Sequence, residues 1–386
     1  MSSERAPDPR GRRVTMLLSN PATFDQRPLK EAHSLAKAGW KVTILAWDRD
    51  LETKADSAFG DGVTVKRMRV GAGHGTPVLT VPKLVLFYLW CLAHLAFSHE
   101  DVVHCHDVDT LPAGYAAKAM GLGKKKLVYD MHDLPEAFLR FFPLTRVTQA
   151  VALDTAKRAA DATLVVNERF VTLLGRMGFD RSKLTVVMNA SPAREGRSGK
   201  KRGDGLGVLY YGSLSEERGV TLLLDAVRGL EGVTLRLAGR GSLEAQVKER
   251  ASKDPSVKFL GWLKMSDLEP EIRRADLIPS LYEPKTKNAQ IATPGKLLTA
   301  MSLSIPTLVP SGSYQAEIVE RFRCGLVVDW SSASDVREAM RRLATDGQLY
   351  DSMSSASYAA FVSEFSWEVM EARLAATYSR LVTHRR

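Results

Sequence analysis

At 386 residues the chain is longer than one hydrophobic core usually organises, so its length predicts two domains. The three cysteines are widely spaced and stand outside any Cys-x-x-Cys or Cys/His cluster, which argues against a disulfide framework and a zinc site and fits a reducing cytosol. The net charge of +10 favours an anionic partner: a nucleotide, an acidic membrane face or a nucleic acid.

The first half of the chain alternates short apolar runs with helical patterns. Residues 1–13 are polar and are expected to form a disordered tail rather than a signal peptide. Strands are predicted at 14–19, 41–47, 63–70, 101–105, 126–130, 162–166 and 184–188, and helices at 28–38, 110–120, 145–160 and 168–177. This alternation predicts parallel βαβ units in a doubly wound α/β sheet.

The apolar segment 78–97 has two interpretations. It is about long enough to span a bilayer, but Pro82, Lys83 and His94 interrupt it. A core helix between two strands is the first interpretation. A helix whose apolar face rests on a membrane surface is the second.

A second α/β series follows the polar stretch 191–207, which is predicted to be a linker between domains. Strands are predicted at 208–211, 234–238, 257–260, 276–281, 305–309 and 326–328, and helices at 220–229, 243–251, 266–274, 297–302, 314–321 and 334–344. The tail is predicted to be helical at 348–361 and 366–382. The domains are therefore expected at 14–190, completed by 366–386, and at 208–365.

Polar clusters stand at the ends of the predicted strands in the first half. His106 and Asp107 follow one strand, and His132 and Asp133 follow the next. Ligands of doubly wound folds bind at the carboxyl ends of the strands, and a His beside an Asp is suited to proton transfer or hydroxyl binding. His104 lies within its strand and is interpreted as a buried structural histidine.

In the second half, phosphate-binding signals occur at two predicted helix starts. Gly212 permits close backbone approach, and Arg218 precedes the next helix. Thr293 is predicted to N-cap a helix with Pro294 at its first position, which places Lys296 beside the free N–H groups. The Gly239-Arg-Gly241 loop is interpreted either as a tight turn or as an approach to a phosphate or base.

These motifs together resemble the family-four glycosyltransferases, which have the GT-B fold. The pattern 101–107, the pattern 127–133, the Tyr210–Leu214 stretch, the Gly239–Gly241 loop and the Pro294–Leu297 turn follow in family order. The resemblance covers nearly the whole chain. It implies two Rossmann-like domains that face each other across a cleft, and transfer of a sugar from a nucleotide donor with retention at the anomeric carbon, without a bound metal or other cofactor.

The resemblance also implies roles for individual residues. His132, with Asp133 beside it, would lie at the reacting face of the donor sugar. Asp25, Arg27 and His106 would face the acceptor. The donor would be bound by Gly212, Ser213, Arg218, Gly239, Gly241, Gly261, Trp262, Leu263, Lys296 and Thr299.

One departure from the family pattern affects the functional prediction. The family usually carries two acidic residues eight positions apart beside the last motif, and here these positions are Ile291 and Thr299. The first hypothesis is a cytoplasmic retaining glycosyltransferase that uses a UDP- or GDP-sugar and a glycan, lipid-linked or small-metabolite acceptor. Peripheral association with the inner face of an anionic membrane accompanies it. The alternative is a catalytically degenerate scaffold that binds a sugar nucleotide or a partner. Nucleic-acid binding is not expected, because the runs 124–126 and 200–202 lack interleaved aromatic residues.

Overall fold

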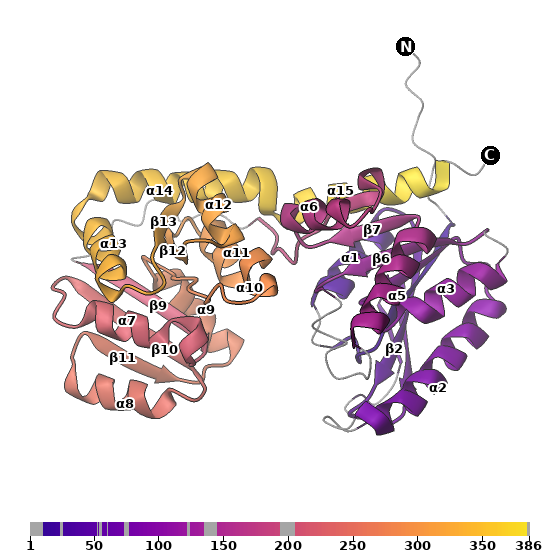
Figure 1. Cartoon of the computed structure of the whole chain (residues 1–386), viewed down its shortest axis with the longest axis horizontal. Helices are drawn as coiled ribbons and strands as arrows, with labels where there is room; N and C mark the ends of the chain where they lie inside the picture. The colour runs from indigo at the N-terminus through magenta and orange to yellow at the C-terminus, as the bar shows by residue number, and fades with distance from the viewer. Residues whose placement is uncertain are drawn as a thin grey trace, which may run out of the picture. The chain divides into compact units, whose positions relative to one another are not determined.

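The computed structural model describes residues 11–23, 26–51, 53, 56–59, 61–72, 77–121, 124–134, 145–193 and 205–383. Contacts divide the chain into two compact units (Figure 1). Unit 1 comprises residues 1–189 and 370–386, and unit 2 comprises 190–369. Residues 1–10 of the expected tail and 194–204 of the expected linker lie outside the described residues.

Unit 1 is built on a sheet of eight strands in the order β3-β4-β2-β1-β5-β6-β7-β8. Neighbouring strands are parallel except β3 and β4. The strands are β1 (Arg13–Leu18), β2 (Lys41–Asp48), β3 (Ser57–Phe59), β4 (Val63–Arg69), β5 (Val102–His106), β6 (Lys126–Met131), β7 (Ala162–Val165) and β8 (Leu184–Val186). The seven predicted strands form, and the antiparallel β3 was not predicted. The central strands β5 and β6 are buried along nearly their whole length because helices cover both faces of the sheet.

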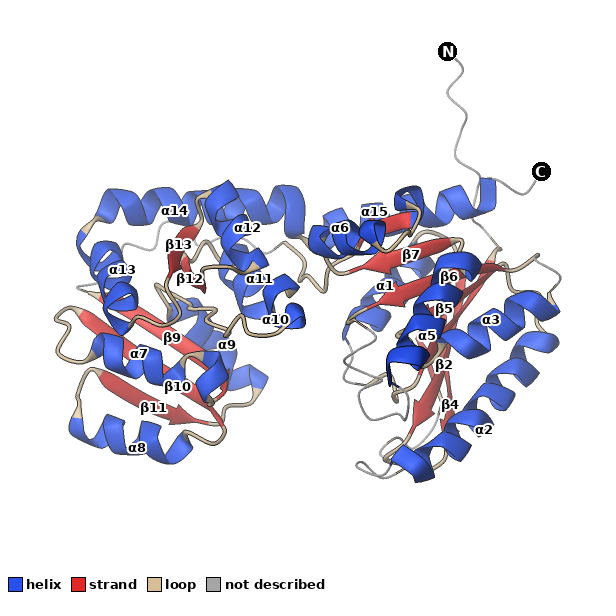
Figure 2. Cartoon of the chain, in the orientation of Figure 1, coloured by secondary structure: helices blue, strands red, loops and turns tan. Residues whose placement is uncertain are grey.

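The helices of unit 1 are α1 (Gln26–Lys37), α2 (Pro77–Ala96), α3 (Leu111–Met120), α5 (Thr145–Ala159), α6 (Glu168–Arg176) and the end of α15 (Trp367–Thr383). Figure 2 shows α2, α3 and α5 side by side over one face of the sheet. Phe87 of α2 stacks on Trp47 of β2 at 5.8 Å between ring centroids. From α15, the Tyr378 hydroxyl lies 2.8 Å from Nδ1 of His104. His104 is fully buried, as predicted.

Unit 2 has a three-stranded parallel sheet and a two-stranded one. Their strands are β9 (Leu206–Ser213), β10 (Val233–Arg240), β11 (Val257–Gly261), β12 (Thr307–Pro310) and β13 (Gly325–Val328). The predicted strand 276–281 forms only a single bridge, between Leu277 and Val208, while Ser280 donates its N–H to Leu308. Pro279 has no N–H to donate, which interrupts a continuous ladder there. The segment nevertheless joins the two small sheets.

The helices of unit 2 surround these sheets. They are α7 (Val220–Val227), α8 (Glu244–Lys253), α9 (Met265–Arg274), α10 (Lys287–Ile291), α11 (Gly295–Ser302), α12 (Tyr314–Phe322), α13 (Ala333–Thr345), α14 (Gly347–Ala360) and the start of α15. The prediction for the start of α11 was wrong by one residue. Pro294 itself takes the N-cap position with ψ at 140°, an extended conformation, so Thr293 is not the cap.

The segment that includes the predicted 78–97 helix is α2, between β4 and β5. Within the described residues, no helix has the length and apolar composition needed to cross a bilayer.

Candidate functional site

The carboxyl edge of the unit 1 sheet brings together the polar residues that follow β5 and β6. His106 is the last residue of β5, and His132 comes directly after β6. Asp107 adopts a left-handed conformation with φ at 62° and donates its N–H to the carbonyl of Asp130 at 2.9 Å. This turn places the carboxylate of Asp107 against His132, while Asp133 is half-buried at the next bend.

Asp130 lies at the centre of this cluster. Its Oδ2 accepts a hydrogen bond from Nε2 of His132 at 2.8 Å and lies 3.1 Å from Nδ1 of His106. Asp107 contacts His132 from the other side, with its Oδ2 3.6 Å from Nδ1. Asp130 is fully buried, whereas His132 is 17 % exposed. Of the two histidines beside Asp130, His132 therefore has both a fixed ring and access to solvent.

Arg27 lies beneath this cluster. Its guanidinium is 2 % exposed, donates to Oε1 of Glu31 at 2.9 Å and also binds Asp130. The expectation that Arg27 faces an acceptor therefore needs correction, because α1 turns this side chain into the core of unit 1. Its role in the site is to hold Asp130 in place. Asp25, also expected to face the acceptor, lies outside the described residues.

The charges of the cluster affect one another strongly. Burial lowers the pKa of His132, but attraction to Asp130 and Asp107 outweighs burial and raises it to about 9. Burial raises the pKa of Asp107 to about 7 and also raises that of Glu31. Burial would likewise raise the pKa of Asp130, yet Arg27 and His132 hold it well below its ordinary value. His132 therefore carries a proton at neutral pH, as a hydrogen-bond donor with positive charge.

Four side chains of this cluster have the composition of a metal site. Atoms of Glu31, His104, His106 and Asp130 that could act as ligands all lie within 4.8 Å of one another. However, the guanidinium of Arg27 already binds both carboxylates. A cation from the chain thus balances the buried charge, so we interpret the cluster as an ionic network that fixes His132.

In unit 2 the two cationic side chains predicted to bind the donor, Arg218 and Lys296, lie near each other at the carboxyl end of β9. Burial and the nearby charge of Arg218 lower the pKa of Lys296 to about 8. A Cβ atom on Gly212 would lie 3.2 Å from the Nζ of Lys296, so the glycine leaves that ammonium room. The same Nζ lies 5.1 Å from the ring centroid of Tyr210. Arg218 stacks on Tyr282 at 4.1 Å. Rigid aromatic faces thus hold both cations.

A small pocket of about 310 Å³ lies around Gly212, the glycine beside the Nζ of Lys296. Gly212, Ser213, Gly239, Trp262 and Leu263 line it, all of them predicted donor-site residues. Gly261 immediately precedes Trp262 at the end of β11, in a left-handed conformation with φ at 70°.

The two glycines of the 239–241 loop have a packing role in the structure. A Cβ on Gly239 would lie 1.8 Å from the carbonyl oxygen of Gly212, and one on Gly241 would lie 2.3 Å from that of Leu214. The two chain segments thus approach so closely where β9 and β10 end that only glycine fits at positions 239 and 241. Close packing of the backbone therefore explains both glycines without a ligand, while Gly239 also borders the pocket.

The two positions at which the family carries acidic residues have apolar and hydroxyl side chains. Ile291 is the last residue of α10, and Thr299 lies on α11. The Thr299 hydroxyl is hydrogen-bonded to the side chain of Tyr211.

Three residues of the unit 1 cluster were given no individual role from the sequence: Glu31, which was not singled out, and Asp107 and Asp130, which stood only as members of polar clusters near strand ends. Glu31 follows Arg27 by four positions on α1, a spacing that brings ion-pair partners together on a helix. Asp130 is the next-to-last residue of a mostly apolar strand, and a carboxylate at such a position requires a buried partner. Both signals were present in the sequence.

Two family models match the chain. Residues 26–190 match the glycosyl transferase 4-like domain, and residues 205–346 match the glycosyl transferases group 1 domain. Together with the doubly wound sheets and the carboxyl-edge clusters, these matches define a glycosyltransferase with the GT-B fold. The chain belongs to the group 1, family-four-like glycosyltransferases.

Solved structures show the same fold at low sequence identity. Sucrose-phosphate synthase from Thermosynechococcus elongatus is 18 % identical, with a TM-score of 0.71 over 96 % of this chain and 100 % of that one. Anabaena HepE, solved in complex with UDP-glucose, is 16 % identical, with a TM-score of 0.68 over 95 % and 99 %. WaaG, a glycosyltransferase involved in lipopolysaccharide biosynthesis, is 15 % identical, with a TM-score of 0.64 over 94 % and 99 %. No curated protein sequence matches significantly.

Proposed function

We propose that this protein transfers a sugar from a nucleoside diphosphate sugar to an acceptor, with retention at the anomeric carbon and without a metal. The observation that carries the proposal is the pair of cations, Lys296 and Arg218, beside the bare backbone of Gly212. Lys296 lies near the start of α11 and Arg218 lies just before α7, and two positive charges at helix starts suit a diphosphate, both in the donor and as the leaving group. The UDP-glucose complex of HepE supports a UDP-sugar as the first donor to test.

In this mechanism the pocket lined by Gly212, Trp262 and Leu263 takes the base and ribose of the nucleotide. Lys296 and Arg218 stabilise the negative charge that grows on the diphosphate as the glycosidic bond breaks. His132 carries a proton and donates a hydrogen bond at the reacting face of the sugar. His106 and Asp133 lie next to His132 and would contact the sugar or its acceptor. The Thr299 hydroxyl would supply one of the ribose contacts that a carboxylate provides elsewhere in the family.

We propose a glycan, a lipid-linked molecule or a small metabolite as the acceptor, and the cytoplasm as the location, with peripheral membrane association. Calorimetric titration with UDP and GDP tests the nucleotide site. Incubation with a panel of donors, followed by measurement of released nucleotide, tests turnover. If neither UDP nor GDP binds, the proposal is refuted.

A second candidate function follows from the side chains at Ile291 and Thr299. Without the acidic pair, the protein would bind a sugar nucleotide or a partner without transferring the sugar. Under this alternative, His132→Ala leaves biological activity intact, whereas the enzyme requires His132. Nucleotide binding without nucleotide release across the donor panel would favour this binding function.

A further inference from the structure

Helix α2 has an unusual outward face. Between residues 80 and 96, every exposed side chain is apolar: Val81, Pro82, Val85, Leu86, Leu89, Ala93 and Ala96. Phe97, directly after the helix, is 92 % exposed. The one lysine in the helix, Lys83, is half-buried and donates to the carbonyl of Gly71. A surface helix normally presents polar residues to water, so this face is suited to a non-aqueous contact.

The apolar face extends over the neighbouring helices of the same layer. Tyr115 and Met120 of α3 and Val147 and Val151 of α5 are all more than half exposed. Helices α2, α3 and α5 lie side by side over one face of the sheet (Figure 2). Nine of the fourteen large hydrophobic side chains most exposed in the described chain belong to α2, Phe97, α3 or α5. We call the outer surface of these three helices, together with Phe97, the apolar helix face.

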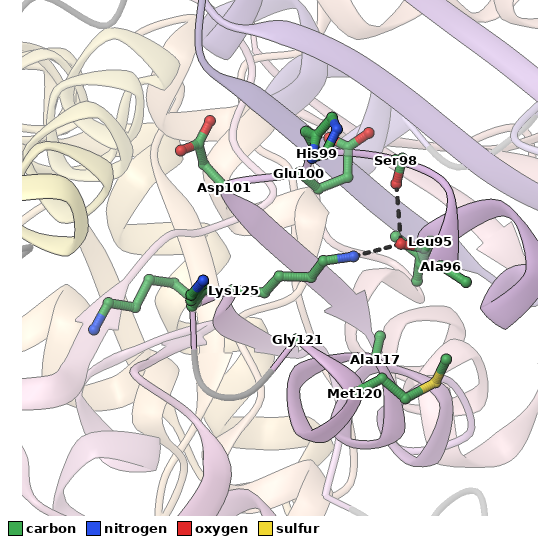
Figure 3. Close-up of a pocket in the computed structure, with 12 residues that line it drawn as sticks. Leu95, Ala96, Ser98, His99, Glu100, Asp101, Ala117, Met120, Gly121 and Lys125 are labelled. Carbon is green, nitrogen blue, oxygen red and sulfur yellow. Dashed lines mark hydrogen bonds between the residues drawn. The ribbon is translucent and has the colours of Figure 1, made fainter.

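Positively charged side chains accompany this face. Lys157 and Arg158 are exposed on the last turn of α5, and Lys124 is exposed just beyond α3. A recess of about 840 Å³ lies where α2 ends, at the amino edge of β5 and β6 (Figure 3). Leu95 and Met120 are among its apolar lining residues.

The recess combines these apolar residues with charged ones. Lys124, Lys125 and Lys126 line it together with Glu100 and Asp101. Lys125 reaches the carbonyl of Leu95, as Figure 3 shows. Asp101 accepts the backbone N–H of Arg13 at 3.0 Å, and Lys126 lies 3.6 Å from Asp161. A phosphate-bearing headgroup beside acyl chains would match this combination of lysines and apolar surface.

The apolar helix face could be covered by a second copy of this chain or by a lipid surface, and the net charge of the chain favours one of them. A second copy of this chain carries the same net charge of +10, so two copies repel each other, whereas an anionic lipid surface attracts the chain. A helix that exposes one apolar side can lie in the plane of a membrane interface, with that side in the boundary between headgroups and acyl chains. We propose that the apolar helix face docks unit 1 on an anionic membrane.

Docking in this orientation also bears on the acceptor. The turn from β5 to α3, which includes Asp107 and Thr110, places the start of α3 at the sheet edge that carries His106 and His132. The helix layer thus begins at the carboxyl edge, and a membrane along the layer would pass beside that edge. The acceptor class that fits is therefore a lipid-linked one. The docking names the surface for the peripheral membrane association proposed above, and the acceptor class rests in addition on the proposed sugar transfer.

Flotation of the full-length protein with vesicles tests the docking. We expect binding to phosphatidylcholine vesicles that contain a quarter phosphatidylglycerol, weaker binding to phosphatidylcholine alone, and release by salt. Leu86→Glu and Leu89→Glu should each weaken partitioning roughly ten- to hundred-fold, because each removes one inserted leucine. The matched control is Met265→Glu, which changes an exposed methionine of unit 2 and should leave binding unchanged.

Two results would overturn the docking proposal. One is the absence of wild-type binding to the anionic vesicles. The other is a dimer, detected by light scattering, that Leu89→Glu converts to a monomer, since a second copy would then cover the face. Leu89→Ser provides a milder test if circular dichroism shows that a glutamate variant misfolds. Titration of the wild-type protein with UDP in the same samples separates the two proposals. A protein that binds vesicles but no nucleotide would contradict the proposed sugar transfer and would leave the docking intact.

Discussion

Replacement of His132 by glutamine should remove a specific pH dependence from the stability of unit 1. The pKa of His132 is raised to about 9 in the folded protein, against an ordinary value near 6.5. A histidine with a raised folded-state pKa contributes stability that is fully present below about 6.5 and is lost as pH rises through 9. At about 1.4 kcal/mol per pKa unit, the loss is on the order of 3 kcal/mol. His132→Gln lacks this contribution at every pH.

Hydrogen exchange at the amides of β6 measures the effect within unit 1. After correction for the intrinsic exchange rate, the free energy of opening in the wild type should fall between pH 6 and 9.5. The fall should be smaller by about 3 kcal/mol in His132→Gln. Asp107 also titrates, with its pKa raised to about 7 by burial, so it destabilises the fold mainly as pH rises from about 4 to 7. In the wild type most of that change lies below this window. In His132→Gln the pKa of Asp107 rises further, because the positive charge that lowers it is gone, so the remaining fall in the variant is assigned to Asp107.

The matched control is His99→Gln, which makes the same substitution at an exposed histidine of unit 1. It should keep the wild-type slope. If all three proteins lose stability with the same slope, the pair formed by Asp130 and His132 does not hold a proton at neutral pH. The electrostatic role assigned to His132 would then be wrong.

Three further predictions concern single residues. Lys296→Met should weaken UDP binding about ten- to hundred-fold, as measured by calorimetry. The wild-type affinity should decline as pH rises above about 8, and this decline should be absent in the variant. The control Lys248→Met, at an exposed site, should change neither the affinity nor its pH dependence. Gly239→Ala should lower the free energy of unfolding, measured by thermal denaturation, by about 3 kcal/mol, because the added Cβ would lie 1.8 Å from a backbone oxygen. The control Gly347→Ala adds a Cβ where no atom lies within 4 Å, and it should be nearly neutral. Arg27→Met should destabilise unit 1 by roughly 3–5 kcal/mol, because two buried carboxylates lose their cation; an unchanged melting temperature would contradict its structural role.

Much of the fold could be predicted from the sequence. Runs of β-branched residues between helical patterns located the strands of unit 1, since strands covered on both faces are mostly apolar. The short antiparallel β3 escaped prediction because its three residues form no clear pattern. The segment 276–281 was predicted as a full strand from its apolar composition, without account of the missing N–H at Pro279.

The candidate site was predicted less completely. His106 and His132 were identified because polar residues directly after strands converge at one sheet edge. Their partners Glu31 and Asp130 were not assigned roles. The spacing of Glu31 from Arg27 and the place of Asp130 in a buried strand indicate buried partners, but they do not show which charges meet. Arg27 was assigned to the acceptor from the family resemblance, which does not show that α1 turns its side chain into the core.

The sequence by itself determined the two α/β series, the family and the order of the motifs, because these depend on periodicity and on residue types at fixed positions along the chain. The tertiary structure decided which charges meet. It placed Arg27 inside unit 1, brought Lys296 near Arg218, and left the apolar side of α2 facing outward. Contacts of this kind join residues far apart in the chain, and their energies depend on distance and burial, which only the folded arrangement sets.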